Sequence, residues 1–120
     1  MTSETITIYH NPSCSKSRET LQILEQHMIQ PKIIEYLDTP PSKNELIGII
    51  QKLGLPPVEL LRTSEKVYME ANFQTDLMSD DEIIDAITKH PSLLQRPIVV
   101  CKNKAIIGRP PIKVLDIIFS

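Results

Sequence analysis

The sequence lacks a long apolar run, a cluster of basic residues and a set of closely spaced cysteines. Residues 1–8 carry Glu4 and have neither a basic start nor a long apolar stretch, which argues against a signal peptide or a membrane-spanning segment. A net charge of -2 without a run of Lys and Arg gives no reason to expect a nucleic-acid binder. We therefore expect a cytoplasmic protein with no membrane or nucleic-acid partner.

Cysteine is scarce as well, and its two positions, Cys14 and Cys101, lie too far apart to suggest a disulfide framework. The chain also has no internal repeat, low-complexity segment or linker, and its ten prolines are dispersed. With 120 residues, 41% of them apolar, it fits one compact domain spanning residues 1–120.

The first forty residues predict a strand, a helix and a second strand. Residues 5–9 (TITIY) alternate polar and β-branched side chains, and residues 32–36 (KIIEY) form a similar short run. Between them, residues 15–28 place Leu21, Leu24 and Met28 on one helical stripe. Such a unit favours a parallel pair of strands joined by a right-handed crossover.

The middle of the chain predicts helices. Ser42 and Glu45 form one capping box, whose helix ends at Gly54, and Ser79 and Glu82 form another, whose helix ends at residues 90–91. Shorter helices are expected at residues 57–61 and 65–71.

The last part returns to strands at residues 97–101 and 104–107, which suggest a hairpin, and a final helix begins at Pro110 or Pro111. The whole order matches an α/β, thioredoxin-like core, a mixed four-stranded sheet flanked by helices, with a helical insertion at about residues 42–91.

The most reactive position is Cys14, between the end of a strand and the start of a helix. The free amides and the dipole of a helix's first turn favour an anion, and Lys16 and Arg18 add positive charge. Such settings lower the pKa of a cysteine from about 8.5 into the range of roughly 3.5–7.5. Ser15 and Ser17 offer hydrogen bonds to the sulfur or to a bound oxyanion, while His10 is close enough to orient the thiol or stabilise the thiolate.

Each of these residues also has a simpler interpretation. Cys14 as a small buried turn residue is disfavoured by its polar and cationic neighbours. His10 could equally cap the strand end, and Lys16 fits a solvated helix face. Cys101 fits a buried strand residue, since four residues of strand put it roughly 13 Å from Pro97, too far for a direct disulfide.

The sequence resembles the glutaredoxin-coupled arsenate reductases along nearly its whole length. Residues 6–21 (ITIYHNPSCSKSRETL) resemble the family's strand, catalytic loop and helix, although Ser15 and Lys16 differ from the small pair of some relatives. Further matching segments are residues 36–41 (YLDTPP), 60–62 (LLR), 90–91 (HP), 96–100 (RPIVV) and 108–110 (GRP).

The resemblance implies roles for individual residues. Cys14 would be the nucleophile, with His10 helping to keep it reactive. Ser17 and Arg18 would support the loop, and Pro97 matches a cis-proline position. The implied oxyanion clamp consists of Arg62, Arg96 and Arg109.

It also implies a reaction. Cys14 would form an adduct with arsenate, glutathione would be the reducing co-substrate, and glutaredoxin would resolve a mixed disulfide, with no bound cofactor and no metal. We expect the protein to act as a monomer.

Four alternatives remain. One is a glutathione-dependent thiol protein with another substrate, and one is a non-enzymatic redox regulator that binds RNA polymerase, although Ser17 stands where its CxxC switch would place the second sulfur. A cysteine phosphatase would need an arginine where Thr20 stands, and a glycine in the loop. A metal site from His10, Cys14, His90 and Cys101 matches no zinc spacing.

Overall fold

The computed structural model describes residues 6–62, 65–71 and 75–118 of the chain. Its contacts divide the chain into two compact units, which are described separately below. The sheet unit comprises Met1–Thr39 and Arg96–Ser120, and the helical unit comprises Pro40–Gln95. The expected organisation as one domain with a helical insertion stays a prediction.

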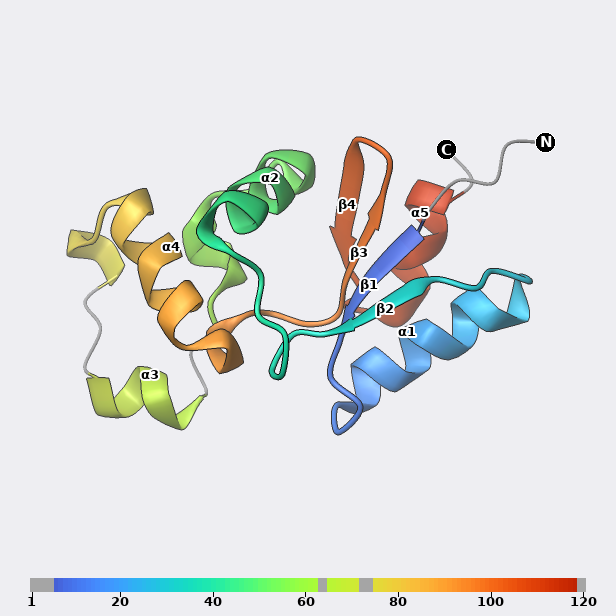
Figure 1. Cartoon of the computed structure of the whole chain (residues 1–120), viewed down its shortest axis with the longest axis horizontal. Coiled ribbons are helices and arrows are strands. Elements are labelled where there is room, and N and C mark those ends of the chain that lie inside the picture. The colour runs from blue at the N-terminus through green and yellow to red at the C-terminus, as the bar shows by residue number, and fades with distance from the viewer. Residues whose placement is uncertain (1–5, 63–64, 72–74, 119–120) are drawn as a thin grey trace. The chain divides into compact units, whose positions relative to one another are not determined.

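The sheet unit contains four strands in the order β2-β1-β3-β4 (Figure 1). β1 (Ile6–His10) pairs parallel to β2 (Lys32–Glu35) and antiparallel to β3 (Ile98–Cys101), which forms a hairpin with β4 (Lys104–Ile107). The α/β class with a mixed four-stranded sheet is therefore confirmed, including the parallel first pair.

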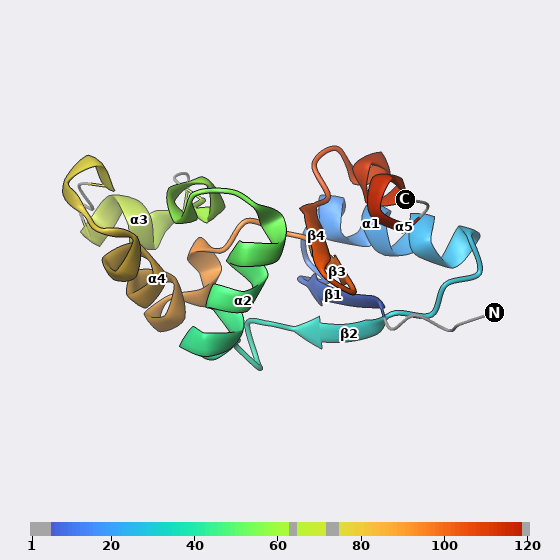
Figure 2. The same ribbon diagram turned by 90° about the horizontal axis from the view of Figure 1, so that it is seen from above.

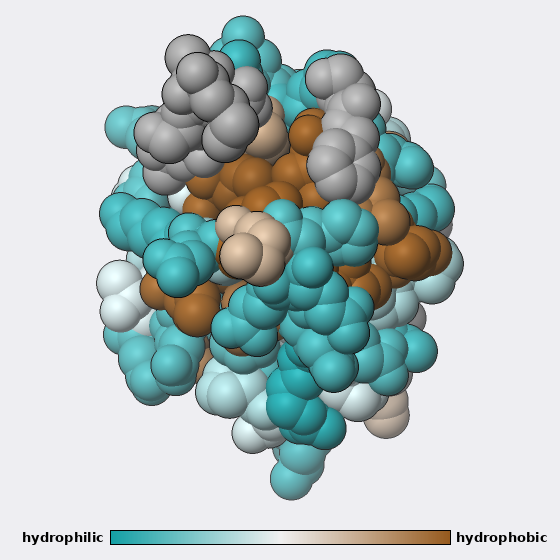
Figure 3. Space-filling model, turned by 90° about the vertical axis from the view of Figure 1, so that its right-hand side faces the viewer, coloured by the Kyte–Doolittle hydropathy of each residue, from teal (hydrophilic) through white to brown (hydrophobic). Residues whose placement is uncertain are grey.

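One face of this sheet is covered by α1 (Ser15–Gln26) and by the C-terminal helices η4 (Pro111–Val114) and α5 (Leu115–Ile118) (Figure 2). The core under them is built from alternate strand residues and the apolar stripe of α1, because side chains on one face of a strand recur at every second position. Its fully enclosed members include Ile8, Leu24, Val99 and Val114. Figure 3 views the side of the sheet unit that carries α5, where apolar side chains come to the surface among hydrophilic ones.

The main difference from the expected elements is the end of α1. The helix ends at Gln26, two residues earlier than predicted, because Met28 adopts a left-handed backbone with φ of 62°. The amides of Met28 and Ile29 turn back to the carbonyls of Glu25 and Leu24, which satisfies the last turn. At the other end of the unit, Thr5, expected in the first strand, lies outside the described residues.

The helical unit contains six helical segments among its described residues. They are α2 (Lys43–Leu53), η1 (Pro57–Leu60), α3 (Lys66–Ala71), η2 (Thr75–Leu77), α4 (Asp80–Lys89) and η3 (Pro91–Leu93). Both capping boxes are confirmed, since the Ser42 and Ser79 hydroxyls each accept from the N3 amide while the N3 glutamate accepts from the serine amide. Gly54 ends α2 with a φ of 68°, a conformation that suits glycine.

Two pairings join segments of the helical unit. Lys43 of α2 bonds both Asp81 and Asp85 of α4, at 2.9 and 3.0 Å. An isolated antiparallel bridge links Leu61 to Leu94. Within the described part of the chain, no helix is both long enough and apolar enough to span a membrane.

Candidate active site around Cys14

The loop between β1 and α1 is organised by Asn11. Its Oδ1 accepts from the Ser13 amide at 3.0 Å, and its carbonyl accepts from the Cys14 amide at 3.0 Å. The Asn11 amide in turn donates to the buried Ser17 hydroxyl at 3.3 Å. Asparagine commonly closes such a turn through its own side chain. Sequence reasoning missed this role, although an Asn-Pro dipeptide at a strand end is a turn signal.

Cys14 is the N-cap residue of α1, with φ of -97° and ψ of 124°. Its sulfur therefore lies at the end of the helix where backbone N–H groups have no intrahelical partner. The first turn contains no acidic side chain, so nothing there offsets the positive end of the helix dipole. This placement is the one predicted from the sequence.

The Cys14 thiol has a lowered pKa. Burial alone would raise it, but the Ser17 amide, the Arg96 guanidinium and the Lys16 amide outweigh that effect and bring the pKa to about 7. About half of the thiol is therefore thiolate at neutral pH, which is the nucleophilic form.

Two arginines from distant segments converge on the sulfur. Arg109 Nη2 lies 3.8 Å from Cys14 Sγ, and the Arg96 guanidinium favours the thiolate by hydrogen bonding and charge. Arg109 Nε also donates to the Arg96 carbonyl at 2.7 Å, and this bond fixes the segment of Arg109 against the segment of Arg96. The expected clamp therefore has two of its three cations beside the nucleophile.

Arg96 has a second neighbour that sequence reasoning did not single out. Tyr36, directly after β2, is fully buried. Burial would lower the pKa of Arg96, but the Tyr36 phenol and the Cys14 sulfur beside it raise the pKa overall. Arg96 therefore stays protonated between a tyrosine and a thiolate. The only signal in the sequence was a tyrosine at the end of a predicted strand, residues 32–36.

His10 is the last residue of β1 and is buried, with Nδ1 lacking a hydrogen-bond partner among the described residues. Burial lowers its pKa; Glu35, its register partner in β2, opposes this effect, and the Arg18 charge adds to it. The ring is consequently neutral at pH 7. Orienting the thiol and capping the strand end both fit a neutral ring, whereas stabilising the thiolate through a positive charge does not.

The supporting residues occupy different positions. Ser15 is exposed at the start of α1, whereas Ser17 is buried beneath the loop. Arg18 is exposed and donates from Nη1 to the Pro12 carbonyl at 2.9 Å, which braces the loop from outside. Pro97 is buried, and its peptide bond with Arg96 is cis, as the resemblance implies; the Arg109-Pro110 bond is cis as well.

Arg62 belongs to the helical unit and is not placed relative to Cys14. Its amide donates to the Leu93 carbonyl at 2.7 Å, and its buried Nε has no hydrogen-bond partner among the described residues. A buried guanidinium nitrogen without a partner is costly, and a bound anion is one way to satisfy it. Its part in the clamp stays a prediction.

Cys101 lies at the far end of the sheet from the loop. It is 4% exposed and pairs with Ile6 at the start of β1, whereas Cys14 follows the end of β1. The interpretation of Cys101 as a buried strand residue is confirmed. Within residues 6–62, 65–71 and 75–118, no three His, Cys, Asp or Glu side chains gather closely enough to hold a metal ion.

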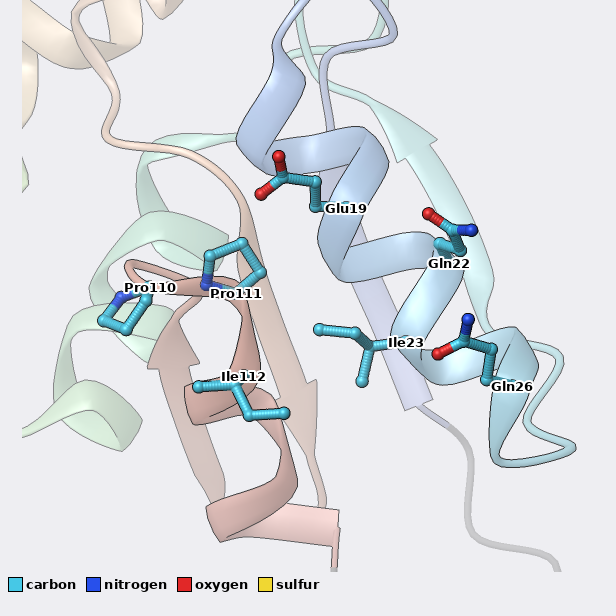
Figure 4. Close-up of a pocket in the computed structure, with 7 residues that line it drawn as sticks. All are labelled: Glu19, Gln22, Ile23, Gln26, Pro110, Pro111 and Ile112. Atoms are coloured by element: carbon cyan, nitrogen blue, oxygen red, sulfur yellow. The ribbon is translucent and has the colours of Figure 1, made fainter.

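A surface pocket of about 350 Å³ lies elsewhere on the sheet unit, between α1 and the segment after Arg109 (Figure 4). Its lining comes from Glu19, Gln22, Ile23, Gln26, Pro110, Pro111 and Ile112. None of these is an expected site residue, so the reactive group is not at the bottom of this pocket.

Comparison with known proteins adds an independent line of evidence. Residues 9–117 match the ArsC family. The chain is 47% identical to an arsenate reductase of Haemophilus influenzae, over 94% of this chain and 98% of that protein. It is 43% identical to the uncharacterized protein YfgD of Escherichia coli K12, over 94% and 96%. The structure of an arsenate reductase from Vibrio cholerae superimposes with a TM-score of 0.92 at 48% identity, covering 97% of this chain and 99% of that one.

Proposed function

The chain belongs to the ArsC family, and from that premise we propose that it is an arsenate reductase whose Cys14 thiolate attacks the arsenic atom. The observation that carries this proposal is the meeting of a thiol of pKa about 7 with two guanidinium groups, one of them 3.8 Å away. The arsenate reductases of Haemophilus influenzae and Vibrio cholerae, at 47% and 48% identity, support the choice of substrate.

The arginines offset the repulsion between the Cys14 thiolate and the arsenate anion. Arsenate at neutral pH carries mostly two negative charges, so a thiolate would repel it. Arg96 and Arg109 neutralise that charge and hold the oxyanion within reach of the sulfur, because guanidinium groups match tetrahedral oxyanions in geometry and charge. Arg62 completes the clamp in this proposal, and His10 acts as a neutral residue that orients the thiol.

The reaction begins when the Cys14 thiolate attacks arsenic, so that a sulfur–arsenic bond forms as an arsenic–oxygen bond breaks. The departing hydroxide takes up a proton and leaves as water. Glutathione then displaces a second hydroxide in the same way. The two sulfurs join in a disulfide as both sulfur–arsenic bonds break, and the electron pair left on arsenic reduces it from the pentavalent to the trivalent state. Arsenite leaves, and Cys14 carries glutathione.

The mixed disulfide is resolved by a second protein. A glutaredoxin thiolate attacks the glutathione sulfur and releases Cys14 as thiolate, and another glutathione restores glutaredoxin. An outside thiol is needed because Ser17 occupies the CxxC position and Cys101 lies at the opposite end of β1. We propose a cytoplasmic location because this chemistry requires a reducing compartment, and we propose that the protein acts as a monomer.

The test is arsenate-dependent NADPH oxidation in a coupled assay with glutathione, glutaredoxin and glutathione reductase. The wild-type protein should turn over only when arsenate and every thiol component are present, and Cys14→Ser should be inactive. Cys101→Ala is the matched control, because it removes the other sulfur from a strand and should keep the activity.

A second candidate is a thiol protein of the same family that acts on another substrate. The 43% identity to YfgD, for which no substrate is named, favours keeping it. If the wild-type protein shows no arsenate turnover while Cys14 still titrates near pH 7, arsenate is the wrong substrate and this candidate replaces the first.

A further inference from the structure

Thr20 is a polar residue that is fully buried. Its side chain is 0% exposed although it lies on α1, only six residues after Cys14. Its Oγ1 donates to the Lys16 carbonyl at 2.8 Å, one turn earlier in the helix. This bond satisfies the hydroxyl and fixes the direction of the side chain, because a β-branched residue in a helix has few allowed rotamers.

The Thr20 side chain packs against Gly108, which itself lies against Pro97. A methyl group added at Gly108 would lie 2.7 Å from Thr20 Oγ1 and 2.9 Å from Pro97 Cγ. Gly108 also donates from its amide to the Pro97 carbonyl at 2.9 Å. Three segments are therefore packed so closely at this point that only glycine fits at position 108.

Each of these segments carries one group of the active site. Cys14 caps the helix that contains Thr20, Arg96 precedes Pro97, and Arg109 follows Gly108. Figure 4 shows α1 beside the segment that continues from Arg109 through Pro110 and Pro111. The separation of the segments at Thr20 consequently sets how far the two guanidinium groups can lie from the sulfur.

We propose that Thr20 is a positioning residue, whose buried side chain packs against Gly108, the residue that bonds to Pro97, and so holds Arg96 and Arg109 in register with the Cys14 sulfur. Because its side chain is fully buried, it acts through the two arginines. The proposal rests on the proposed function only where arsenate kinetics are measured, since the reactivity of Cys14 can be followed without arsenate.

The position also explains how this site differs from a cysteine phosphatase. Thr20 stands where the phosphatase loop places its arginine, but here that position points into the packed interior. A cation there could not reach the loop. The positive charge near the sulfur comes instead from Arg96 and Arg109, on the two segments that Thr20 holds in place.

The test compares three variants by the pH profile of Cys14 alkylation and by the arsenate KM and kcat. Thr20→Ala removes the packed atoms and should raise the midpoint of alkylation, so that the rate at pH 7 falls about twofold or more as the thiolate fraction drops. The arsenate KM should rise more than kcat falls. Thr20→Val keeps the shape and should stay within twofold of wild type.

Thr88→Ala is the matched control, because Thr88 makes the same hydrogen bond, 2.9 Å to the Ile84 carbonyl, in α4 of the helical unit. It should leave the alkylation profile unchanged. The proposal is overturned if Thr20→Ala alkylates like wild type, or if Thr88→Ala shifts the midpoint equally. Absence of arsenate turnover in the wild-type protein would count against the proposed function, while the alkylation profiles would still decide the role of Thr20.

Discussion

At the scale of single residues, the reactivity of Cys14 is a balance between burial and the groups around the sulfur. Burial opposes the thiolate, and two amides and the Arg96 guanidinium favour it. The balance lies close to neutrality, so a change in any one partner alters the fraction of reactive sulfur at physiological pH.

The first prediction concerns Arg96. Alkylation of the wild-type protein by iodoacetamide should increase with pH with a midpoint of about 7. Arg96→Met removes a charge and a hydrogen bond that favour the thiolate, so the midpoint should rise toward the ordinary value of about 8.5. Lys113→Met, which removes an exposed cation from η4, is the control and should keep the wild-type midpoint. An unchanged midpoint in Arg96→Met would contradict the role of this arginine.

The second prediction separates two roles of His10. Because its pKa is lowered by burial, the ring is neutral at pH 7 and contributes no positive charge to the thiolate. His10→Asn should therefore leave the alkylation midpoint of Cys14 close to 7. A clear rise of the midpoint would show that the His10 ring contributes to stabilising the thiolate, against the expectation for a neutral ring.

The site itself was partly predictable from the sequence. The Cys14 placement follows from a strand end before a helix start, and the resemblance singled out Arg96 and Arg109. Local patterns contain no trace of a contact between residues 95 positions apart, such as Arg109 with Cys14. For the same reason the Tyr36 contact with Arg96 and the Thr20 contact with Gly108 were missed.

At the scale of elements, the two helices whose N-termini carry the strongest sequence signal begin with the expected geometry. Ser42 and Ser79 make reciprocal bonds with Glu45 and Glu82, all within four consecutive residues. Such motifs are predictable because every partner is local. The end of α1 was less predictable, since no glycine or proline marks it and the left-handed turn falls on Met28.

The third prediction uses the two capping boxes. Ser79→Ala removes the acceptor for the Glu82 amide, and it should lower the free energy of unfolding by about 1 kcal/mol. Ser42→Ala should behave alike. Because Lys43 bonds Asp81 and Asp85, the two helix starts are linked, and the departure of the double variant from the sum measures their coupling. Urea denaturation followed by circular dichroism measures these changes. Cys14 alkylation should not change, and a loss of reactivity would argue against a purely local effect.

At the scale of the whole molecule, the order of elements predicted the α/β class and the parallel first pair of strands, and the expected helical insertion at about residues 42–91 lies within the helical unit, Pro40–Gln95. Hydrophobic periodicity indicates which face of each helix is buried and does not say against which partner. Leu24 lies on the apolar stripe of α1 and Leu46 on that of α2, and both are fully buried, yet they belong to different units.

The fourth prediction tests the expectation of a single domain. Leu24→Ala in the sheet unit and Leu46→Ala in the helical unit each empty a fully buried position, which costs roughly 2–5 kcal/mol. If the chain is one cooperative domain, each variant should shift a single urea transition, with hydrogen exchange of both units weakened together. Two separate transitions, each sensitive to one variant, would show that the units unfold independently.

The burial of Cys101 at the end of β3 has a practical consequence. One equivalent of a thiol reagent should label the native protein at Cys14, and a second should be consumed only as β3 becomes accessible. Once Cys14 has been blocked, the rate at which Cys101 is labelled measures how often the sheet opens, because the reagent reaches Cys101 only while β3 is exposed. Cys101 is thus a native probe of local opening of the sheet, and no engineered cysteine is needed.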